Sequence, residues 1–141
     1  MSFQLTKPCR LGEVSWTRKD MMDEFSVFVE RGIYTQRPVR ASNRKNTGGT
    51  GFMHSFYMWF IIRMLDPEHI IESGALHGVG TWMLRQASPT AQLIVISPKT
   101  PKLYIDNATN SVYFTGDQFK DFSQVNWNCL NINKAKTLVF F

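Results

Sequence analysis

The fold of this chain is decided by residues 70–82, which read IIESGALHGVGTW. The two isoleucines at the start are apolar and β-branched, as in a short strand that is buried on both faces. Gly74 permits a sharp turn, while Gly78 and Gly80 leave the start of a following helix bare. The first turn of a helix offers unpaired N–H groups and the positive end of a dipole. With Glu72 at the end of the strand, the pattern predicts a site for a nucleotide-like cofactor.

The spacing of the glycines excludes two common phosphate-binding motifs. The dinucleotide motif G-x-G-x-x-G is not met, because Leu76 stands where its second glycine would be. The P-loop G-x-x-x-x-G-K-[ST] fails as well, since Gly74 and Gly78 are one residue too close together and no lysine precedes Thr81. The pattern that remains is E-x-G-x-x-x-G. An ordinary strand-to-helix turn is the alternative interpretation, because any α/β protein can carry two glycines there.

This E-x-G-x-x-x-G turn resembles motif I of class I S-adenosylmethionine-dependent methyltransferases. The closer likeness is to the branch of small-molecule O-methyltransferases and cephalosporin-hydroxylase-like proteins, which tolerates Leu76 at the central glycine position. The resemblance spans residues 50–141 and implies a methyltransferase that binds S-adenosylmethionine and acts on a small-molecule hydroxyl. It implies that the cofactor is held by Glu72, Gly74, Ala75, His77, Gly78, Thr81, Ser97 and Asp117.

Three later segments predict strands that join residues 70–73 in one sheet. They are Gln92–Ile96, Ser111–Thr115 and Thr137–Phe141, all apolar and rich in β-branched or aromatic residues. The first begins about twenty residues after the glycine-turn strand, a separation that suits a βαβ crossover. We therefore expect an α/β fold, a Rossmann-like three-layer sandwich with a mainly parallel sheet. The resemblance implies the strand order 3-2-1-4 for these four strands, with N-terminal helices packed beside them.

Two positions bear on how a nucleotide would be held. A carboxylate after the second strand of such folds commonly binds the ribose hydroxyls, but this chain has Ser97 followed by a proline. A serine still accepts a hydrogen bond, although it carries no charge. Asp106 lies too far along the chain to be assigned that role. Asp117 follows the third strand and resembles the family's acid near the adenine, with an ordinary turn aspartate as the alternative.

The first 50 residues are expected to form an arm, a helix and a basic linker ahead of an α/β domain at 51–141. Residues 1–16 show no clear period and predict a loose arm. Thr17 is placed to cap a helix that runs to about Arg31 and ends at Gly32.

The linker, residues 35–51, is polar and basic and contains a glycine run, which favours a solvated loop. The resemblance also allows Gly49 and Thr50 to fold over the methionine end of the cofactor. A nucleic-acid surface is not expected, because the linker lacks interleaved aromatic residues and no recognised module is present.

Composition excludes several other classes of protein. The chain has 141 residues, 43% of them hydrophobic, and a net charge of +5, which suits one globular domain. Its two cysteines and three histidines form no metal-ligand spacing, so no metal site is expected. The longest apolar run, Phe52–Leu65, falls short of the ~20 residues that span a bilayer. With no signal-peptide pattern at the N-terminus, we expect a cytoplasmic protein without a membrane partner.

The last strand would form an apolar edge of the sheet, and natural proteins usually cover such edges. The family's sheet has seven strands, so the sequence indicates a fragment, the N-terminal half of a methyltransferase-like domain. Alternatively, a second copy of the chain or another protein covers this edge.

The sequence is compatible with three hypotheses for the function. The first is the methyltransferase already named, whose catalytic residues the sequence does not assign. His77 is the only candidate for a general base within the turn, against a structural or solvated histidine. The second is a non-catalytic α/β fragment or interaction module that has lost its activity. The third is a hydroxylase-like or other nucleotide-dependent enzyme, because one fold supports many functions.

Overall fold

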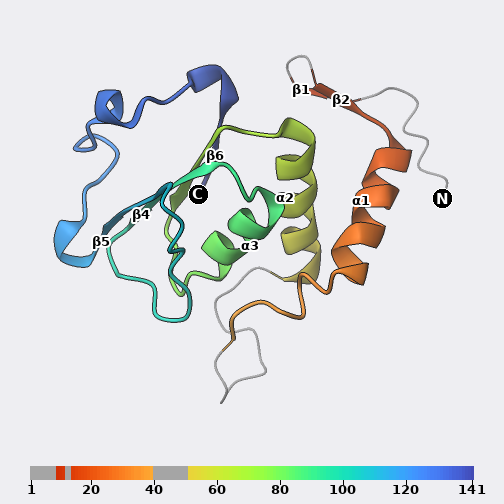
Figure 1. Ribbon diagram of the computed structural model, residues 1–141, viewed down its shortest axis with the longest axis horizontal. Coiled ribbons are helices and arrows are strands. Elements are labelled where there is room, and N and C mark those ends of the chain that lie inside the picture. The colour runs from red at the N-terminus through yellow and green to blue at the C-terminus, as the bar shows by residue number, and fades with distance from the viewer. Residues whose placement is uncertain (1–8, 12–13, 40–50) are drawn as a thin grey trace.

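The computed structural model describes residues 9–11, 14–39 and 51–141. Four parallel strands form the central sheet: β3 (His69–Ser73), β4 (Gln92–Ser97), β5 (Ser111–Thr115) and β6 (Thr137–Phe140). Their order across the sheet is β5-β4-β3-β6, which confirms the predicted order 3-2-1-4. The Rossmann-like α/β fold is confirmed with it, because β4 and β5 extend to one side of β3 and β6 lies on the other (Figure 1).

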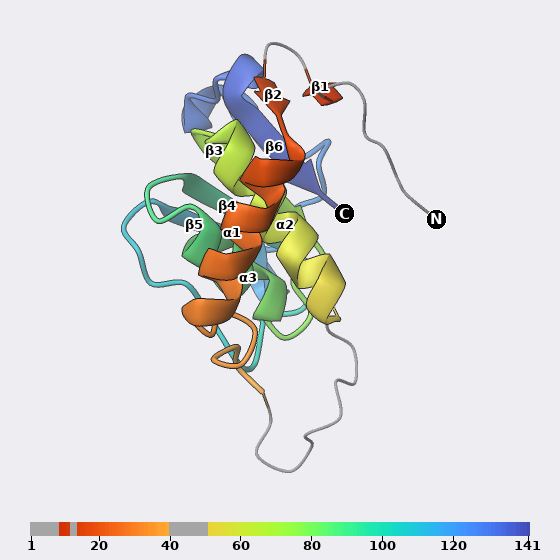
Figure 2. The same ribbon diagram turned by 90° about the vertical axis from the view of Figure 1, so that its right-hand side faces the viewer.

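Three helices cover one face of this sheet: α1 (Arg18–Glu30), α2 (Phe52–Leu65) and α3 (Val79–Ala87). Figures 1 and 2 show α2 and α3 near the sheet and α1 outside them. α2 buries Phe56, Trp59 and Phe60 in the core, while Met53 and Tyr57 of the same helix stay exposed to solvent. The shared core contains fully buried side chains from every layer: Phe28, Trp59, Ile62, Ile70, Met83, Leu84 and Leu93.

The predicted ends of α1 are confirmed. Thr17 caps the helix, and its side chain and that of Asp20 each accept a hydrogen bond from the other's backbone N–H. This reciprocal arrangement satisfies two donors that the first turn leaves unpaired. Gly32 follows the helix with a φ of 61°, a left-handed conformation that glycine adopts without a steric penalty.

The second face of the sheet is covered by the connection from β5 to β6. It contains three short 3₁₀ turns, Gly116–Gln118, Trp127–Leu130 and Lys134–Lys136. Phe122 and Trp127 pack over Ile71 and Ile94, as expected of aromatic residues that cover the sheet. Phe119, at the start of the same connection, is 38% exposed.

The prediction of a loose N-terminal arm is wrong for the residues that the structure describes there. Cys9–Leu11 and Val14–Trp16 form an antiparallel pair of strands, β1 and β2. Strands of three residues are too short to show an alternating pattern, which is why the sequence did not reveal them. The predicted roles of Gly49 and Thr50 lie outside the described residues.

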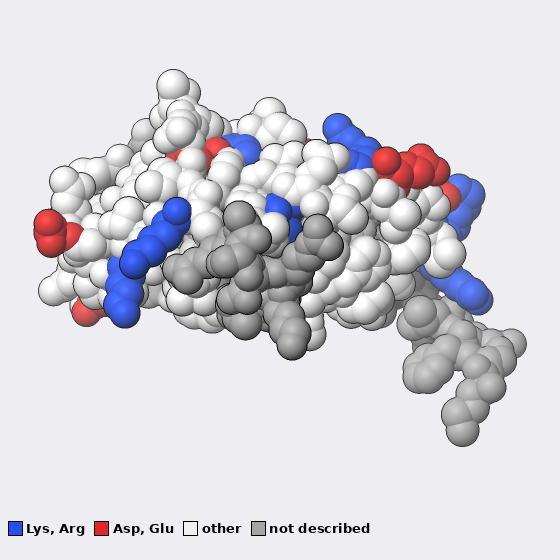
Figure 3. All heavy atoms as spheres, turned by 90° about the horizontal axis from the view of Figure 1, so that it is seen from below, with Lys and Arg blue, Asp and Glu red and all other residues white. Residues whose placement is uncertain are grey.

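One face of the molecule shows both signs of charge. On the face drawn in Figure 3, the coloured Lys and Arg side chains are scattered and lie among Asp and Glu. Within the described ranges, no helix has the length and hydropathy needed to cross a membrane.

Candidate functional site

The glycine turn joins the end of β3 to the start of α3. Gly74 has a φ of 87°, and its N–H donates to the carbonyl of Ile96 at 2.8 Å. No atom lies within 4 Å of the position that a Cβ at Gly74 would take, so this glycine borders open space. Leu76, at the place of the family's central glycine, has a φ of 47° and is 51% exposed. A leucine thus holds a left-handed conformation that a glycine would adopt more easily, which is a local strain at the turn.

The helix after the turn begins at Val79. Gly78 is its N-cap, with a φ of 85° and no side chain to close the first turn.

A cavity of about 320 Å³ lies beside this turn. Its polar wall is the end of β3 with the glycine turn, and its apolar walls include Met58 of α2 and Phe140 of β6. The sheet order reverses between β3 and β6, and open α/β sheets bind ligands outside the carboxyl ends of their strands at such a switch point. The cavity therefore lies at the position where open α/β sheets commonly bind ligands.

Four of the eight predicted cofactor residues line this cavity together: Glu72, Gly74, Ala75 and His77. Glu72 is 7% exposed and accepts a short hydrogen bond from the Thr81 hydroxyl. Burial raises the pKa of Glu72 to about 7, although its hydrogen bonds from Thr81 act in the opposite direction. A carboxyl group with this pKa changes charge near neutral pH, which is typical of groups in functional sites.

The structure explains why residue 80 is a glycine, which the sequence did not show. A Cβ at this position would collide with the Glu72 carboxyl group, so the missing side chain makes room for that acid. Thr81 is fully buried beneath the same carboxyl group. Thr81 therefore holds Glu72 from inside the protein and does not line the cavity.

His77 lines the cavity, and its backbone is anchored by the loop after β4. Its carbonyl accepts hydrogen bonds from the N–H groups of Leu103 and Tyr104, at 3.1 and 3.2 Å. Its Nδ1 is buried and has no hydrogen-bond partner within the described part of the chain. Buried polar atoms normally have a partner, so this nitrogen is a candidate to bind a ligand.

The other predicted cofactor residues lie away from the cavity. The space beside Gly78 is filled by the chain itself, because the Tyr104 carbonyl lies where a Cβ would be. Ser97 ends β4 and is only 3% exposed. Asp117 lies in the 3₁₀ turn after β5, exposed to solvent and apart from the residues that line the cavity. The structure thus gathers the β3 end of the predicted site, while the positions that follow β4 and β5 stand apart.

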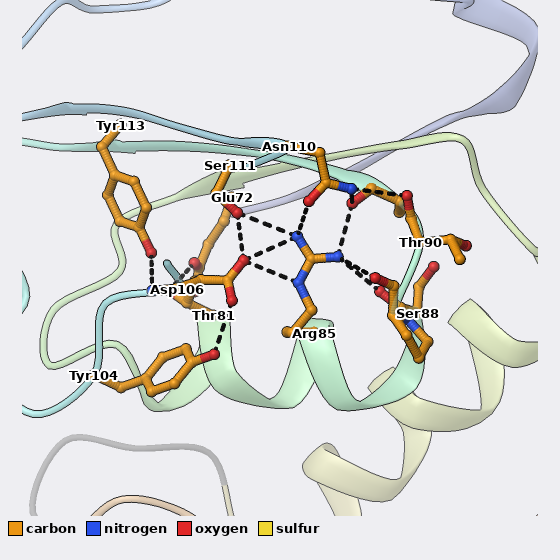
Figure 4. Close-up of polar contacts among 12 residues, drawn as sticks. Glu72, Thr81, Arg85, Ser88, Thr90, Tyr104, Asp106, Asn110, Ser111 and Tyr113 are labelled. Carbon is orange, nitrogen blue, oxygen red and sulfur yellow. Dashed lines mark hydrogen bonds and ion pairs between the residues drawn. The ribbon is translucent and has the colours of Figure 1, made fainter. Parts of the chain in front are cut away.

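A buried polar cluster next to the site was missed at the sequence level (Figure 4). Arg85 of α3 forms an ion pair with Asp106 at 2.9 Å, and both side chains are at least nine-tenths buried. The guanidinium also donates to the carbonyls of Ser88, Pro89 and Ala91 and to the side chains of Asn110 and Ser111. Arg85 follows Thr81 by four residues, hence on the same helix face, and this spacing was the signal that could have placed it inside.

Asp106 connects this cluster to the loop after β4. It accepts hydrogen bonds from the hydroxyls of Tyr104, at 2.9 Å, and Ser111, and its own N–H donates to the Tyr113 hydroxyl at 2.7 Å. Burial alone would raise the pKa of Asp106, but the bonds from Ser111, Arg85 and Tyr104 outweigh it and hold the pKa below its ordinary value. The acid that was too distant in sequence for a ribose role is thus a structural partner of Arg85.

A second cavity, of about 850 Å³, lies on the opposite face of the sheet. Its walls are largely apolar and include Ile71, Trp127 and Val139, with Lys134 and two asparagines among the lining residues. In the ranges that the structure describes, no three His, Cys, Asp or Glu side chains gather as ligands for a metal ion.

Comparison with solved structures gives a distant likeness in fold. No family model matches the chain, and no curated protein matches it. Among solved structures, the SAH-bound methyltransferase PaMTH1 of Podospora anserina matches with a TM-score of 0.43 and 14% sequence identity. The match covers 75% of this chain and 53% of that one, so the chain spans about half the length of that structure.

Proposed function

We propose that this chain binds S-adenosylmethionine at the cavity between the carboxyl ends of β3 and β6, as a methyltransferase-like domain that acts on a small-molecule hydroxyl. The observation that carries the proposal is the position of Gly74. It turns the chain at the topological switch point, with an acid just before it and open space where a side chain would be. A glycine with a positive φ beside a cavity is the arrangement that lets a ligand approach the backbone closely.

The residues around the cavity suit the amino-acid half of this cofactor. Glu72 can accept hydrogen bonds from an ammonium group, and a positive charge there would lower its pKa of about 7. Met58 and Phe140 provide apolar walls for a thioether-like chain. The sulfonium of the bound cofactor supplies the reactive methyl group, so the protein contributes position and electrostatics.

Substitution at Gly74 tests this site. Gly74→Ala would place a methyl group in the cavity, and we expect it to weaken binding of S-adenosylmethionine by about tenfold or more, as expected when a close approach is blocked. Gly32→Ala is the matched control, because Gly32 also has a positive φ, 61°, but lies at the end of α1. Isothermal titration of the wild type and both variants with S-adenosylmethionine measures the effect. If Gly74→Ala binds S-adenosylmethionine as tightly as the wild type, the cavity at Gly74 is not the binding site.

An interaction module that has kept the fold without catalysis is the second candidate. The specific observation in its favour is Ser97, a buried and uncharged residue where nucleotide-binding folds commonly place a ribose-binding acid. The two candidates differ in turnover. Transfer of a labelled methyl group to any member of a panel of small hydroxyl compounds would favour the enzyme, and cofactor binding without transfer to any of them would favour the module.

A further inference from the structure

The loop that joins β4 to β5, residues 98–110, folds back over the beginning of α3. The N–H groups of Leu103 and Tyr104 both donate to the carbonyl of His77. The Tyr104 carbonyl fills the Cβ position of Gly78, and the Pro101 side chain comes within 3.2 Å of the same position. The β4–β5 loop is therefore seated on the same glycine turn whose other side borders the cavity.

The β4–β5 loop also approaches the residue that follows β5. Ser97, from which the loop departs, is only 3% exposed. The Thr100 hydroxyl would lie 2.7 Å from a Cβ at Gly116, the residue that follows β5. The loop thus reaches from the start of α3 to the end of β5, across the strand end where α/β folds commonly hold a ribose.

A buried clamp holds the loop in this position. Arg85 Nε donates to Asp106 at 2.9 Å, and the Tyr104 hydroxyl donates to the other carboxylate oxygen at 2.9 Å. Tyr104 therefore takes part in two contacts at once, with the clamp through its hydroxyl and with the glycine turn through its backbone (Figure 4). Weakening the Asp106 contact should free the part of the loop that rests on Gly78.

The size of the cavity makes the position of this loop important. Small-molecule sites usually enclose about 300–1,000 Å³, and this cavity of about 320 Å³ is at the lower end of that range. S-adenosylmethionine has an amino-acid half and a larger nucleoside half. The residues that suit the amino-acid half line the cavity, whereas Ser97 and Asp117, predicted for the nucleoside half, do not.

We propose that the β4–β5 loop is a lid over the nucleoside half of the cofactor site, held shut by the Arg85–Asp106 ion pair and the Tyr104 hydroxyl. This inference rests on the proposed function. The amino-acid half enters the cavity at Gly74 with the lid closed, and the adenosine half binds after the lid leaves Gly78. Opening breaks the two hydrogen bonds to the His77 carbonyl. Asp106 and Tyr104 are positioning residues, since they act on the ligand through the loop.

Rapid mixing with S-adenosylmethionine tests the lid. Asp106→Asn and Tyr104→Phe each weaken the clamp, and we expect each to raise the association rate constant about tenfold, the factor that corresponds to one lost charge-assisted hydrogen bond. Methionine, which lacks the nucleoside, should bind all forms with the same affinity. Lys102→Ala is the matched control, because Lys102 is exposed on the same loop. Hydrogen exchange at the amides of Leu103 and Tyr104 reports lid opening directly and should accelerate in both clamp variants.

The possible results distinguish a failure of the lid from a failure of the proposed function. Faster association in the clamp variants, with unchanged methionine affinity, supports the lid. If S-adenosylmethionine binds every form with the same rate constant, the lid is wrong and the binding function stands. If neither the wild type nor any variant binds it, the proposed function and the lid fail together. Tyr104→Phe keeps the ring and the backbone contacts, so it decides the question if Asp106→Asn does not fold.

Discussion

The carbonyl oxygen of Tyr104 lies against Gly78 so closely that a Cβ at position 78 has no room. The two residues are far apart in the sequence, yet this contact joins the β4–β5 loop to the first turn of α3. It shows that one glycine of a cofactor-like motif serves the packing of the protein on itself. Gly74, in the same turn, has the opposite surroundings, because nothing lies within 4 Å of its Cβ position.

The contrast between these two glycines predicts different stability losses. Gly78→Ala should lower the free energy of unfolding by about 2–4 kcal/mol, since it adds a clash with backbone to the strain of a positive φ. Gly74→Ala, at nearly the same φ, should lose only about 1–2 kcal/mol from conformational strain. Urea unfolding of both variants measures the difference. Equal losses of unfolding free energy would show that the β4–β5 loop moves to accommodate a side chain at position 78.

Glu72 predicts a pH dependence of stability. Its pKa is about 7 in the folded protein, above the ordinary value of 4.5, because burial disfavours the charged form. The folded state therefore binds the proton more tightly than the unfolded state, and stability decreases as the pH rises from about 4.5 to about 7. Glu72→Gln stays neutral, so the wild type should lose about 2–3 kcal/mol relative to this variant between pH 5 and pH 8. Urea unfolding at several pH values measures it, and a constant difference would contradict the raised pKa.

Thr81 predicts a second effect on the same carboxyl group. Thr81→Val removes the hydroxyl that donates to Glu72 and leaves a buried acid with fewer hydrogen bonds. We expect a loss of about 1–3 kcal/mol in unfolding free energy and a further rise in the Glu72 pKa, because the Thr81 bonds lower it. Thr81→Ser keeps the hydroxyl and is the control. Carbon-detected NMR titration of the Glu72 carboxyl group reports the pKa, and the same midpoint in both variants would refute the role of the hydroxyl.

The buried ion pair of Arg85 predicts a large stability loss. Arg85→Met leaves Asp106 as an uncompensated buried charge, and breaking such a pair is expected to lower the unfolding free energy by about 3–5 kcal/mol. Arg63→Met is the comparison, because the Arg63 side chain is 43% exposed in its pair with Glu24. Exposed pairs contribute only about 0–1 kcal/mol. Thermal and urea unfolding of the two variants measure the ratio, and similar losses would mean that Arg85 is not a structural clamp.

The order of helices and strands along the chain could be predicted from the sequence, because it depends on local sequence patterns. Apolar runs of strand length, the capping box at Thr17 and the stop at Gly32 are each decided within a few residues. Their positions agree with the structure to within two residues for α2 and the four sheet strands. The three-residue strands of the N-terminal hairpin were missed for the same reason, since they are too short to carry a pattern.

The sequence predicted only part of the candidate site. Glu72, Gly74, Ala75 and His77 are close in sequence, so one turn of chain brings them to one cavity. Ser97 and Asp117 belong to neighbouring strands, and whether they face that cavity depends on the path of the loop between those strands. That path is set by Arg85 and Asp106, which are separated by 20 intervening residues along the chain and interact through space.

The sequence by itself determined the strands, the helices, their parallel order through the resemblance, and the acid and glycines at the end of β3. The tertiary structure alone decided which glycine borders open space and which is filled by the chain. It also decided that Asp106 pairs with Arg85 and that Ser97 is covered. The physical reason is that periodicity and turn chemistry are local properties, whereas cavities, buried ion pairs and raised pKa values depend on which distant side chains exclude water from one another.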